Sequence, residues 1–426
     1  MSPSAQTRRT FLTFLAAGAT TSVAGCAFLG GGRSPDPNAV TFANWSETVV
    51  SEMYTRVLGE FGNQTGVRVA PQAGVSFDDY QTRFRTLLAG GAPPDVMRLN
   101  DDFLREMSDK RQLLDIGPLV SAVDTSDLYP ELLDFTNLPA GRGGLAIGQS
   151  PRVVYYNKTV FAAAGIHPPR TWSAEGWTWD DFLAAANEVT TPERYGAIVN
   201  PDTGYENTFA VNNGGQGIFS EDGRSFTLAD PEGYEAIQWV ADLTLVHRVQ
   251  PSWAEMLPEN ADVNYFASGR AAMLFATMGT ASFMRKNVTD FEWDVAPVPG
   301  HVQQRQEGSN VVFVIPAKSR NPEQAWRLLQ YLVSAPVGEL FASTGTYVPI
   351  SSSAAQKVTA SATGGENVAL FAEAVNHTAP VNSTTATSQA VQLYRPQLDG
   401  VYTGETTAEA ALTGVRARVE EVLRRR

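Results

Sequence analysis

The sequence is poor in the residues that bind metals or form cross-links. It has one cysteine and four histidines among 426 residues. A single cysteine excludes a disulfide framework and any metal site built from several cysteines. No two histidines lie within five residues of each other, which excludes the H-E-x-x-H pattern of a helical zinc site. The chain also lacks the G-x-x-x-x-G-K-[ST] loop, so we expect no coupling to ATP by the chain itself.

Positive charge is also in short supply. Lys and Arg total 32 against 45 Asp and Glu, which gives a formal net charge of −13. An acidic surface repels phosphate backbones, so the composition argues against a nucleic-acid-binding protein. Hydrophobic residues make up 43% and charged residues 18%, which is typical of a globular chain and not of a disordered one. The length allows two or three domains.

The first 25 residues predict an export signal. Arg8 and Arg9 precede an apolar stretch of about fifteen residues, short of the roughly 20 that span a bilayer as a helix. This pattern is typical of a secretory signal peptide, and T-R-R-T-F-L resembles a twin-arginine signal. The next segment, V-A-G-C, resembles a bacterial lipobox and implies a lipid on Cys26 after cleavage. Residues 26–37, rich in Gly and then in Pro, are expected to form a tether.

Short apolar runs alternate with amphipathic helical patterns after the tether. We expect strands over residues 40–43, 67–69 and 95–99, and helices over residues 47–61 and from Ser76 to the Gly-Gly pair at 90–91. Ser76 and Asp79 form a capping box at the start of the second helix. Strands that alternate with helices favour α/β layers in which much of the sheet is parallel.

The second half of the chain continues this alternation. Thr178 and Asp181 form another capping box, and residues 313–315 are typical of a buried strand. The stretches 351–365 and 382–388 are rich in Ser, Thr and Ala, and we expect both to be surface loops. No internal repeat with a fixed period is present.

A series of short strings carries a resemblance to a known family. In chain order they are F-G-N-Q-T-G-V-R-V, L-L-A-G-G-A-P-P-D-V, L-L-D-I-G-P-L, V-V-Y-Y-N-K-T-V-F, P-P-R-T-W, W-D-D-F, F-A-S-G-R-A-A-M, W-D-V-A-P-V-P, R-N-P-E-Q-A-W, V-P-I and G-E-T-T-A-E-A-A-L. Their collinear order resembles the family 1 extracellular solute-binding proteins of ABC importers, the maltose-binding-protein-like sugar receptors. The resemblance implies an α/β protein with the two-lobed type II periplasmic-binding-protein fold, crossover hinge strands and an interlobe cleft.

The resemblance also implies the domain boundaries. The crossover strands would lie near residues 148–153, 309–313 and 347–350. The first lobe would comprise residues 38–150 and 312–347. The second lobe would comprise residues 151–311 and 348–426.

Ligand contacts in the first lobe are expected beyond the carboxyl ends of its strands. The candidates are Asn44, Trp45, Ser46 and Glu47 after the first strand, and Asn100 and Asp101 after the strand at 95–99. Trp45 is the candidate stacking platform for the flat C–H face of a sugar. The alternative is that Trp45 packs in the core. For Asn100 and Asp101 the alternative is helix capping.

The second lobe and the crossovers supply the other candidates. These are Tyr155, Tyr205, Asn207, Gly279, Ser309, Asn310 and Tyr347. Tyr155 adjoins Tyr156, and successive strand residues face opposite sides, so we expect only one of them to reach the cleft. Core packing is the alternative for both. The family commonly has a Gly followed by a ligand-stacking Trp where this sequence has Gly279 and Thr280, which removes one expected sugar platform.

The resemblance implies a lipid-anchored receptor in the periplasm or on the outer face of the cytoplasmic membrane. It would bind a sugar or oligosaccharide, close, and deliver it to the transmembrane subunits of an ABC permease. It would be a monomer that touches the membrane only through Cys26, with no catalytic residue, cofactor or metal.

Two alternatives remain open from the sequence. One is a receptor for an amino acid, a polyamine or ferric ion, in which Arg98 or Arg152 could face a ligand carboxylate. The other is a secreted glycoside hydrolase that uses Asp101 and Asp102, or Glu206.

Overall fold

The computed structural model describes residues 39–45, 48–75, 77–99, 101–173, 176–201, 204–361 and 366–424. The predicted signal peptide, Cys26 and the tether lie outside these residues, as do the candidates Ser46, Glu47 and Asn100. No helix in the described part of the chain is both long enough and apolar enough to span a membrane.

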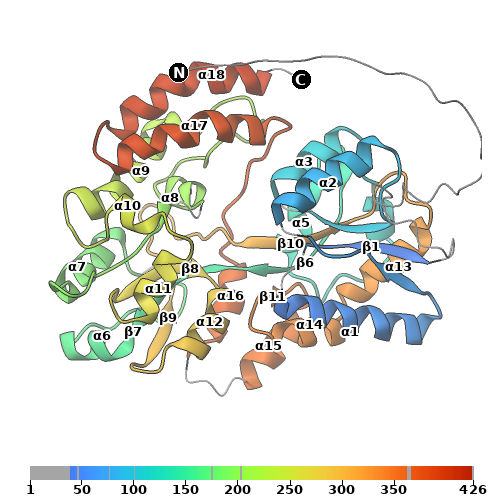
Figure 1. Cartoon of the computed structure of the whole chain (residues 1–426), viewed down its shortest axis with the longest axis horizontal. Helices are drawn as coiled ribbons and strands as arrows, with labels where there is room; N and C mark the ends of the chain where they lie inside the picture. The colour runs from blue at the N-terminus through green and yellow to red at the C-terminus, as the bar shows by residue number, and fades with distance from the viewer. Residues whose placement is uncertain are drawn as a thin grey trace, which may run out of the picture.

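The first lobe is built on a six-stranded sheet with the strand order β11-β6-β10-β3-β1-β2 (Figure 1). Its strands are β1 (Val40–Ala43), β2 (Val69–Pro71), β3 (Val96–Leu99), β6 (Leu145–Ser150), β10 (Ser309–Val314) and β11 (Val348–Pro349). The second lobe holds a three-stranded sheet with the order β8-β7-β9. Its strands are β7 (Arg152–Asn157), β8 (Met273–Thr277) and β9 (Trp293–Ala296). This two-lobed α/β architecture is the fold class that the sequence predicts.

The expectation of a largely parallel sheet is wrong for most strands. β1 pairs in parallel with β2 and β3, because helices connect these three strands in sequence. β10 pairs antiparallel with β3 and β6, and β11 pairs antiparallel with β6. Both pairings of β7 are also antiparallel. Strands joined through a helix by a crossover pair in parallel. β10 enters the first sheet from the second lobe, so this rule does not apply to it.

Helices cover both sheets. In the first lobe these are α1 (Thr48–Thr65), α2 (Phe77–Ala89), α3 (Asp101–Asp109), α4 (Gly117–Val120), α5 (Pro130–Phe135), α13 (Pro322–Leu332) and α14 (Ala335–Ala342), with a small hairpin of β4 (Asn137–Leu138) and β5 (Gly141–Arg142). The other helices are α6 (Lys158–Ala164), α7 (Trp179–Val189), α8 (Glu206–Asn212), η2 (Thr227–Ala229), α9 (Pro231–Leu245), α10 (Trp253–Met256), α11 (Ala261–Ala267), α12 (Thr280–Asn287), α15 (Ser352–Ser361), α16 (Ala369–Val375), α17 (Thr387–Tyr402) and α18 (Ala408–Arg424).

Aromatic side chains fill the core of the first lobe. The ring centroids of Phe42, Tyr54, Phe313 and Phe341 lie 5.1 to 5.6 Å from their neighbours, and all four side chains are buried. Each fully buried ring contributes about 1.5–3 kcal/mol relative to an exposed one. This packing connects β1, β10, α1 and α14 in one hydrophobic core.

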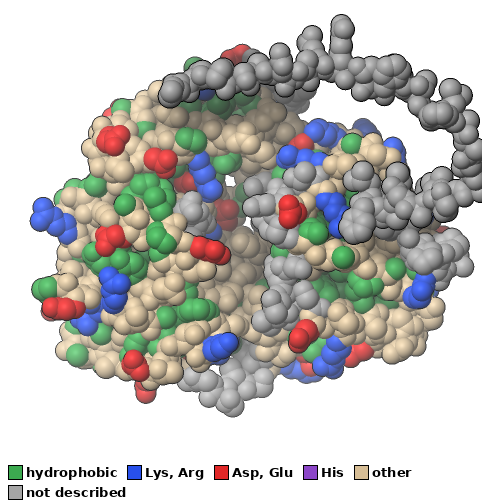
Figure 2. All heavy atoms as spheres, in the orientation of Figure 1, with side chains coloured by type: hydrophobic (Ala, Val, Ile, Leu, Met, Phe, Trp, Pro, Cys, Tyr) green, Lys and Arg blue, Asp and Glu red, His purple; other side chains and the backbone are tan. Residues whose placement is uncertain are grey.

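The chain passes between the lobes where β6 ends at Ser150 and β7 begins at Arg152. β10 starts beside this crossing, directly after Gly308. A Cβ atom on Gly308 would lie 2.6 Å from the carbonyl oxygen of Ser150, so only glycine permits this approach. Residues 309–311 and 348–349 pair within the first-lobe sheet, whereas the predicted boundaries assigned them to the second lobe. The space-filling view shows the molecule hollowed between the two lobes (Figure 2).

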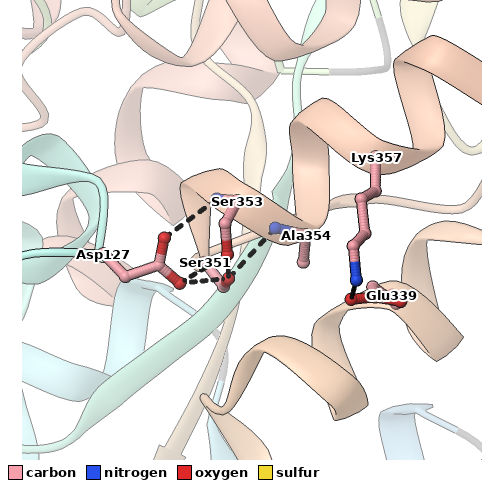
Figure 3. Close-up of polar contacts among 6 residues, drawn as sticks. All are labelled: Asp127, Glu339, Ser351, Ser353, Ala354 and Lys357. Carbon is pink, nitrogen blue, oxygen red and sulfur yellow. Dashed lines mark hydrogen bonds and ion pairs between the residues drawn. The ribbon is translucent and has the colours of Figure 1, made fainter.

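The Ser/Thr/Ala-rich stretch 351–365, predicted to be a loop, forms helix α15 over Ser352–Ser361. Asp127 of the first lobe caps this helix (Figure 3). Its carboxylate accepts four hydrogen bonds, from the hydroxyls of Ser351, Ser352 and Ser353 at 2.6 to 3.1 Å and from the backbone N–H of Ser353 at 2.9 Å. The loop prediction is wrong because the cap comes from a residue more than 220 positions earlier.

We predict that Asp127→Asn lowers the free energy of unfolding by about 1–2 kcal/mol at neutral pH, as loss of a helix cap does. Burial raises the pKa of the Asp127 carboxyl, but the hydrogen bonds from Ser351 and Ser353 lower it by more, so the net pKa lies below its usual range. The stabilisation is therefore complete above the unfolded pKa, about 3.9, and is lost as the pH falls through the folded pKa. Denaturant unfolding of the wild-type protein and of Asp127→Asn, between about pH 2 and pH 7, measures the two free energies of unfolding. We expect the two values to converge as the pH falls.

Asp124 provides the matched control, because it is the same residue type in the same loop. Its carboxylate accepts hydrogen bonds from Ser126, two residues along the chain, including one from the backbone N–H at 2.9 Å. We expect Asp124→Asn to change the stability much less than Asp127→Asn. Equal losses for the two variants would contradict the role of Asp127 as the cap of α15.

Candidate ligand-binding site

A cavity of about 620 Å³ lies between the lobes, beside the crossing strands. Its first-lobe wall comes from Trp45, directly after β1, and from Arg98 of β3. Gly308, Ser309 and Asn310 line it at the start of β10. The second lobe contributes Arg152, Gly204, Glu206, Asn207, Ile218, Phe219, Glu307, Val381, Asn382, Ser383, Thr387, Val391, Tyr394 and Arg395. The cavity therefore meets both lobes and one of the strands that joins them.

A second cavity of about 570 Å³ adjoins the first. The two share Asn310 and residues 381–383, so this short segment separates two parts of one cleft. Asn382 fastens the segment to the second lobe by donating hydrogen bonds to the carbonyls of Gln216 and Phe219, at 3.1 and 3.0 Å. The stretch 382–388 was expected to be a surface loop. Instead it leads into α17, and its first residues line the cleft.

Trp45 and Arg98 form the first-lobe wall as a stacked pair. The guanidinium carbon of Arg98 lies 3.7 Å from the centroid of the Trp45 ring. Tyr80 packs edge-on against the same tryptophan at 5.5 Å and donates a hydrogen bond to the carbonyl of Arg98 at 2.9 Å. Burial raises the pKa of Tyr80 far above its usual range, so the phenol stays protonated as the donor. These contacts leave Trp45 only 8% exposed and cover one of its faces with a cation.

Charged side chains of the second lobe are paired around Glu206. This carboxylate is 1% exposed and accepts hydrogen bonds from Arg395 Nε at 3.0 Å and Nη2 at 3.3 Å. Burial lowers the pKa of Arg152, and the charges of Glu307 and Glu206 oppose that shift. The wall therefore presents charged donors and acceptors in fixed positions. Such groups can bond the hydroxyls of a polar solute without reorganising.

Four of the predicted site residues lie on the cavity wall. They are Trp45, Asn207, Ser309 and Asn310. The side chain of Asn207 braces the wall, because it donates to the carbonyl of Pro380 at 3.0 Å and accepts from the N–H of Ile218 at 3.2 Å. Asn310 accepts a hydrogen bond from Gln149 at 3.0 Å, which connects the cavity to the crossing strands.

Three predicted tyrosines do not line the cavity. Tyr155 is fully buried, and its hydroxyl donates to the carbonyl of Thr277 at 2.9 Å. Tyr205 is also fully buried, with its hydroxyl 2.9 Å from that of Tyr402. Tyr347 packs against Phe341 in the first-lobe core. Their large apolar rings gain more from core packing than from the polar cleft.

The remaining described candidates also lie away from the large cavity. The backbone N–H of Gly279 donates to the hydroxyl of Ser150 at 3.0 Å, so it supports the crossing between the lobes. Asn44 lines a separate small pocket with Tyr80 and Phe84. Asp101 is the first residue of α3.

The sequence interpretation missed Glu307, Arg395 and the segment 381–383 as lining residues. Arg395 had one usable signal, since it lies within the amphipathic pattern of α17 next to the buried Tyr394. Nothing local marks residues 381–383, because their position depends on the hydrogen bonds to the second lobe. No cluster of three or more His, Cys, Asp or Glu placed to hold a metal occurs among the described residues.

Comparison with known proteins gives consistent matches. A family model described as bacterial extracellular solute-binding protein matches residues 44–339. A solved ABC substrate-binding protein of Listeria monocytogenes, in complex with cycloalternan, has a TM-score of 0.77 at 23% identity, covering 90% of this chain and 98% of that one. A solute-binding protein of Thermotoga lettingae bound with α-D-tagatose has a TM-score of 0.75 at 23% identity, with the same coverage. At these identities the structures show the fold alone.

Among curated proteins, Escherichia coli YcjN carries the provisional name of an ABC transporter periplasmic-binding protein. It is 25% identical over 268 residues, which is 58% of this chain and 58% of YcjN. The chain thus spans little more than half the length of this relative. A shorter match, 35% identical over 109 residues, covers 25% of this chain and 22% of the arabinooligosaccharide-binding protein of Halalkalibacterium halodurans.

We predict that Glu206→Gln destabilises the protein by about 2 kcal/mol or more at neutral pH. Removing one partner of a buried ion pair costs about 3–5 kcal/mol, and the 41% exposure of the Arg395 side chain reduces that loss. Thermal unfolding measures the change. Glu235→Gln on α9 is the control, because Glu235 is exposed and the same charge is removed. Equal melting temperatures for the two variants would contradict the importance of the buried pair.

Proposed function

Because the chain belongs to the bacterial extracellular solute-binding proteins, we propose that it is a receptor that binds a sugar or oligosaccharide between its lobes. The observation that carries this proposal is the cavity lined by both lobes and by the start of β10. A ligand held there contacts Trp45 and Arg98 on one side and Glu206 and Arg395 on the other. Only a ligand that touches both lobes can favour the closed state.

The chemistry of the wall supports a polyhydroxylated ligand. Positive and negative groups lie close together, with the amides of Asn310 and Asn382 and the hydroxyl of Ser309. A sugar hydroxyl both donates and accepts hydrogen bonds, so it can satisfy either kind of group. The two adjoining parts of the cleft provide room for more than one sugar ring. Solved structures of the same fold were determined with cycloalternan, tagatose and maltose, which supports the same class.

A receptor of this kind delivers its ligand to the transmembrane subunits of an ABC permease. We place it outside the cytoplasm, held to the membrane as a monomer by a lipid on Cys26 and the tether at 26–37. The lipoprotein of Streptomyces antibioticus that matches 64% of the chain at 24% identity supports the anchor. We propose no catalytic activity for the cleft.

A second candidate is a receptor for a solute that carries a carboxylate, such as an amino acid. The observation that favours it is the presence of Arg98 and Arg152 on the wall of the same cavity. The class of solute that binds, a sugar or a carboxylate-bearing solute, distinguishes the two candidates.

We predict that a sugar raises the melting temperature of the purified protein and that amino acids, polyamines and ferric citrate do not. A ligand at a hundredfold excess over its Kd adds about 2.7 kcal/mol of stability. A thermal-shift screen of mono- and oligosaccharides against the other classes measures this. A shift with an amino acid and none with any sugar would overturn the sugar assignment.

Trp45→Ala tests whether the sugar binds in this cavity. It removes the ring on which Arg98 rests, and we expect sugar affinity to fall by about tenfold or more, or about 1.4 kcal/mol. Trp253→Ala is the control, because Trp253 packs on Tyr402 away from the cavity and loses the same side chain. Equal affinities of the two variants would place the ligand elsewhere.

We predict that Cys26→Ser moves the exported protein from the membrane fraction to the soluble fraction of bacterial cells. The substitution removes the thiol that would carry the lipid and leaves the rest of the signal unchanged. Fractionation with detection of the protein measures the change. Cys26 is the sole cysteine, so Ser22→Ala in the same signal serves as the control and should stay in the membrane fraction. Retention of Cys26→Ser in the membrane would contradict lipid anchoring at this residue.

A further inference from the structure

Asn212 is a fully buried polar residue at the end of α8 that the site described above does not use. The first two residues of α8, Glu206 and Asn207, line the cavity of about 620 Å³. Asn212 lies at the other end of the same helix and lines neither this cavity nor the adjoining one. A buried amide needs partners for its two N–H donors and for its oxygen, so the partners of Asn212 indicate what the residue does.

Five hydrogen bonds join Asn212 to the loop between β9 and β10. Its side-chain Nδ2 donates to the carbonyls of Arg305 at 2.9 Å and Pro299 at 3.4 Å, and its Oδ1 accepts from the N–H of Arg305 at 2.7 Å. Its backbone carbonyl accepts from the N–H groups of Val302 at 2.8 Å and Gln303 at 3.1 Å. The last carbonyls of a helix have no partner within the helix, so the loop satisfies one of them.

This loop carries two polar side chains to the second part of the cleft. Gln303 and Arg305 line the cavity of about 570 Å³, and the backbone of each is bonded to Asn212. The first lobe contributes Glu131 and Asp134 of α5 to the wall of the same cavity. A ligand that extends into this cavity can therefore bond to the loop of the second lobe and to α5 of the first.

The start of the loop is held separately from these two side chains. The ring of His301 stacks on that of Trp179, with a centroid distance of 5.1 Å. For residues 302–305, the described hydrogen bonds that reach beyond the loop go to Asn212. The position of the lining side chains thus depends on one buried residue of α8.

Resting on the sugar-receptor function proposed above, we infer that Asn212 is a positioning residue that sets the affinity for an oligosaccharide relative to a single sugar. It acts through Gln303 and Arg305 and touches no ligand itself. Side chains on a fixed backbone lose less conformational freedom when they bind, so their contacts contribute more affinity. A sugar chain that extends into the 570 Å³ cavity depends on Asn212. A monosaccharide held beside Trp45 in the 620 Å³ cavity does not.

The first test compares the wild-type protein with Asn212→Asp on sugars of increasing length. The substitution keeps the shape of the side chain and replaces its N–H donors by an oxygen that faces the carbonyl of Arg305. The probes are glucose, maltose and maltotriose, and L-arabinose, arabinobiose and arabinotriose, each titrated calorimetrically into the purified protein. We expect trisaccharide affinity to fall by about tenfold, the factor for one hydrogen bond to a charged group, and monosaccharide affinity to change by about twofold or less.

A double-mutant cycle distinguishes positioning from a general loss of stability. The variant that combines Gln303→Ala with Arg305→Ala removes the lining side chains and keeps the backbone bonds to Asn212. We expect it to lose as much trisaccharide affinity as Asn212→Asp, and the combination of all three substitutions to lose no more than about twofold beyond either. Additive losses, or an unchanged trisaccharide affinity of the alanine variant, would overturn the inference. Asn212→Ser, which buries no charge, replaces Asn212→Asp in the cycle if the latter does not fold.

Asn213→Asp is the matched control, because it makes the same change one residue later. The side chain of Asn213 donates to the carbonyl of Glu232 on α9 at 2.9 Å, and we expect the variant to keep all affinities. Equal losses of monosaccharide and trisaccharide affinity in Asn212→Asp would overturn the inference and leave the receptor intact. A wild-type protein that binds neither trisaccharide more tightly than its monosaccharide would do the same. Binding of no sugar, combined with a shift for another solute class in the thermal screen, would overturn the proposed function itself.

Discussion

The buried amide of Gln306 holds together the segments from which the cleft is made. Its Oε1 accepts the N–H of Arg152 at 2.9 Å, and its Nε2 donates to Gln149 Oε1 at 2.9 Å and to the carbonyl of Ala374 at 3.0 Å. Its backbone N–H and carbonyl bond to His377 and Ala379. Leaving this buried amide unpaired would reduce the stability of the folded protein by about 1–3 kcal/mol, so this arrangement is strongly favoured over alternatives. The start of β7, the end of β6 and the chain that leads to α17 are thus held by one residue, through its side-chain amide and its backbone.

This arrangement couples the cavity to the crossing strands. Gln149 donates to Asn310, which lines the cavity, and Gly308 approaches the backbone at Ser150 more closely than any residue with a Cβ could. A ligand that contacts Asn310 therefore acts on the side chain that bonds to the crossing. In the proposed receptor, a ligand in the cavity would act on the same few atoms that hold the crossing, and so would shift the population between open and closed states.

Local sequence patterns predicted the elements whose stabilising contacts are local. The strand at 40–43 was predicted at its observed bounds, and the capping box of Thr178 and Asp181 is present at the start of α7. Helix α15 and the segment 381–383 escaped prediction because distant partners, Asp127 for one and Gln216 with Phe219 for the other, determine their positions. The family resemblance gave the two-lobed fold, since many weak strings in the same order carry more information than any single one.

The candidate site was harder to predict because chain position indicates an edge of a sheet but not which side chain faces the cavity. Residues after β1 were expected near the ligand, yet Arg98 from β3 covers one face of Trp45. In the second lobe, Tyr205 turns into the core toward Tyr402, while its neighbour Glu206 pairs with Arg395 on the cavity wall. One position separates a core residue from a wall residue in this case. The charged groups on this part of the cavity wall thus depend on a contact with α17, almost 190 residues later. The chain is acidic overall, yet arginines line its cleft.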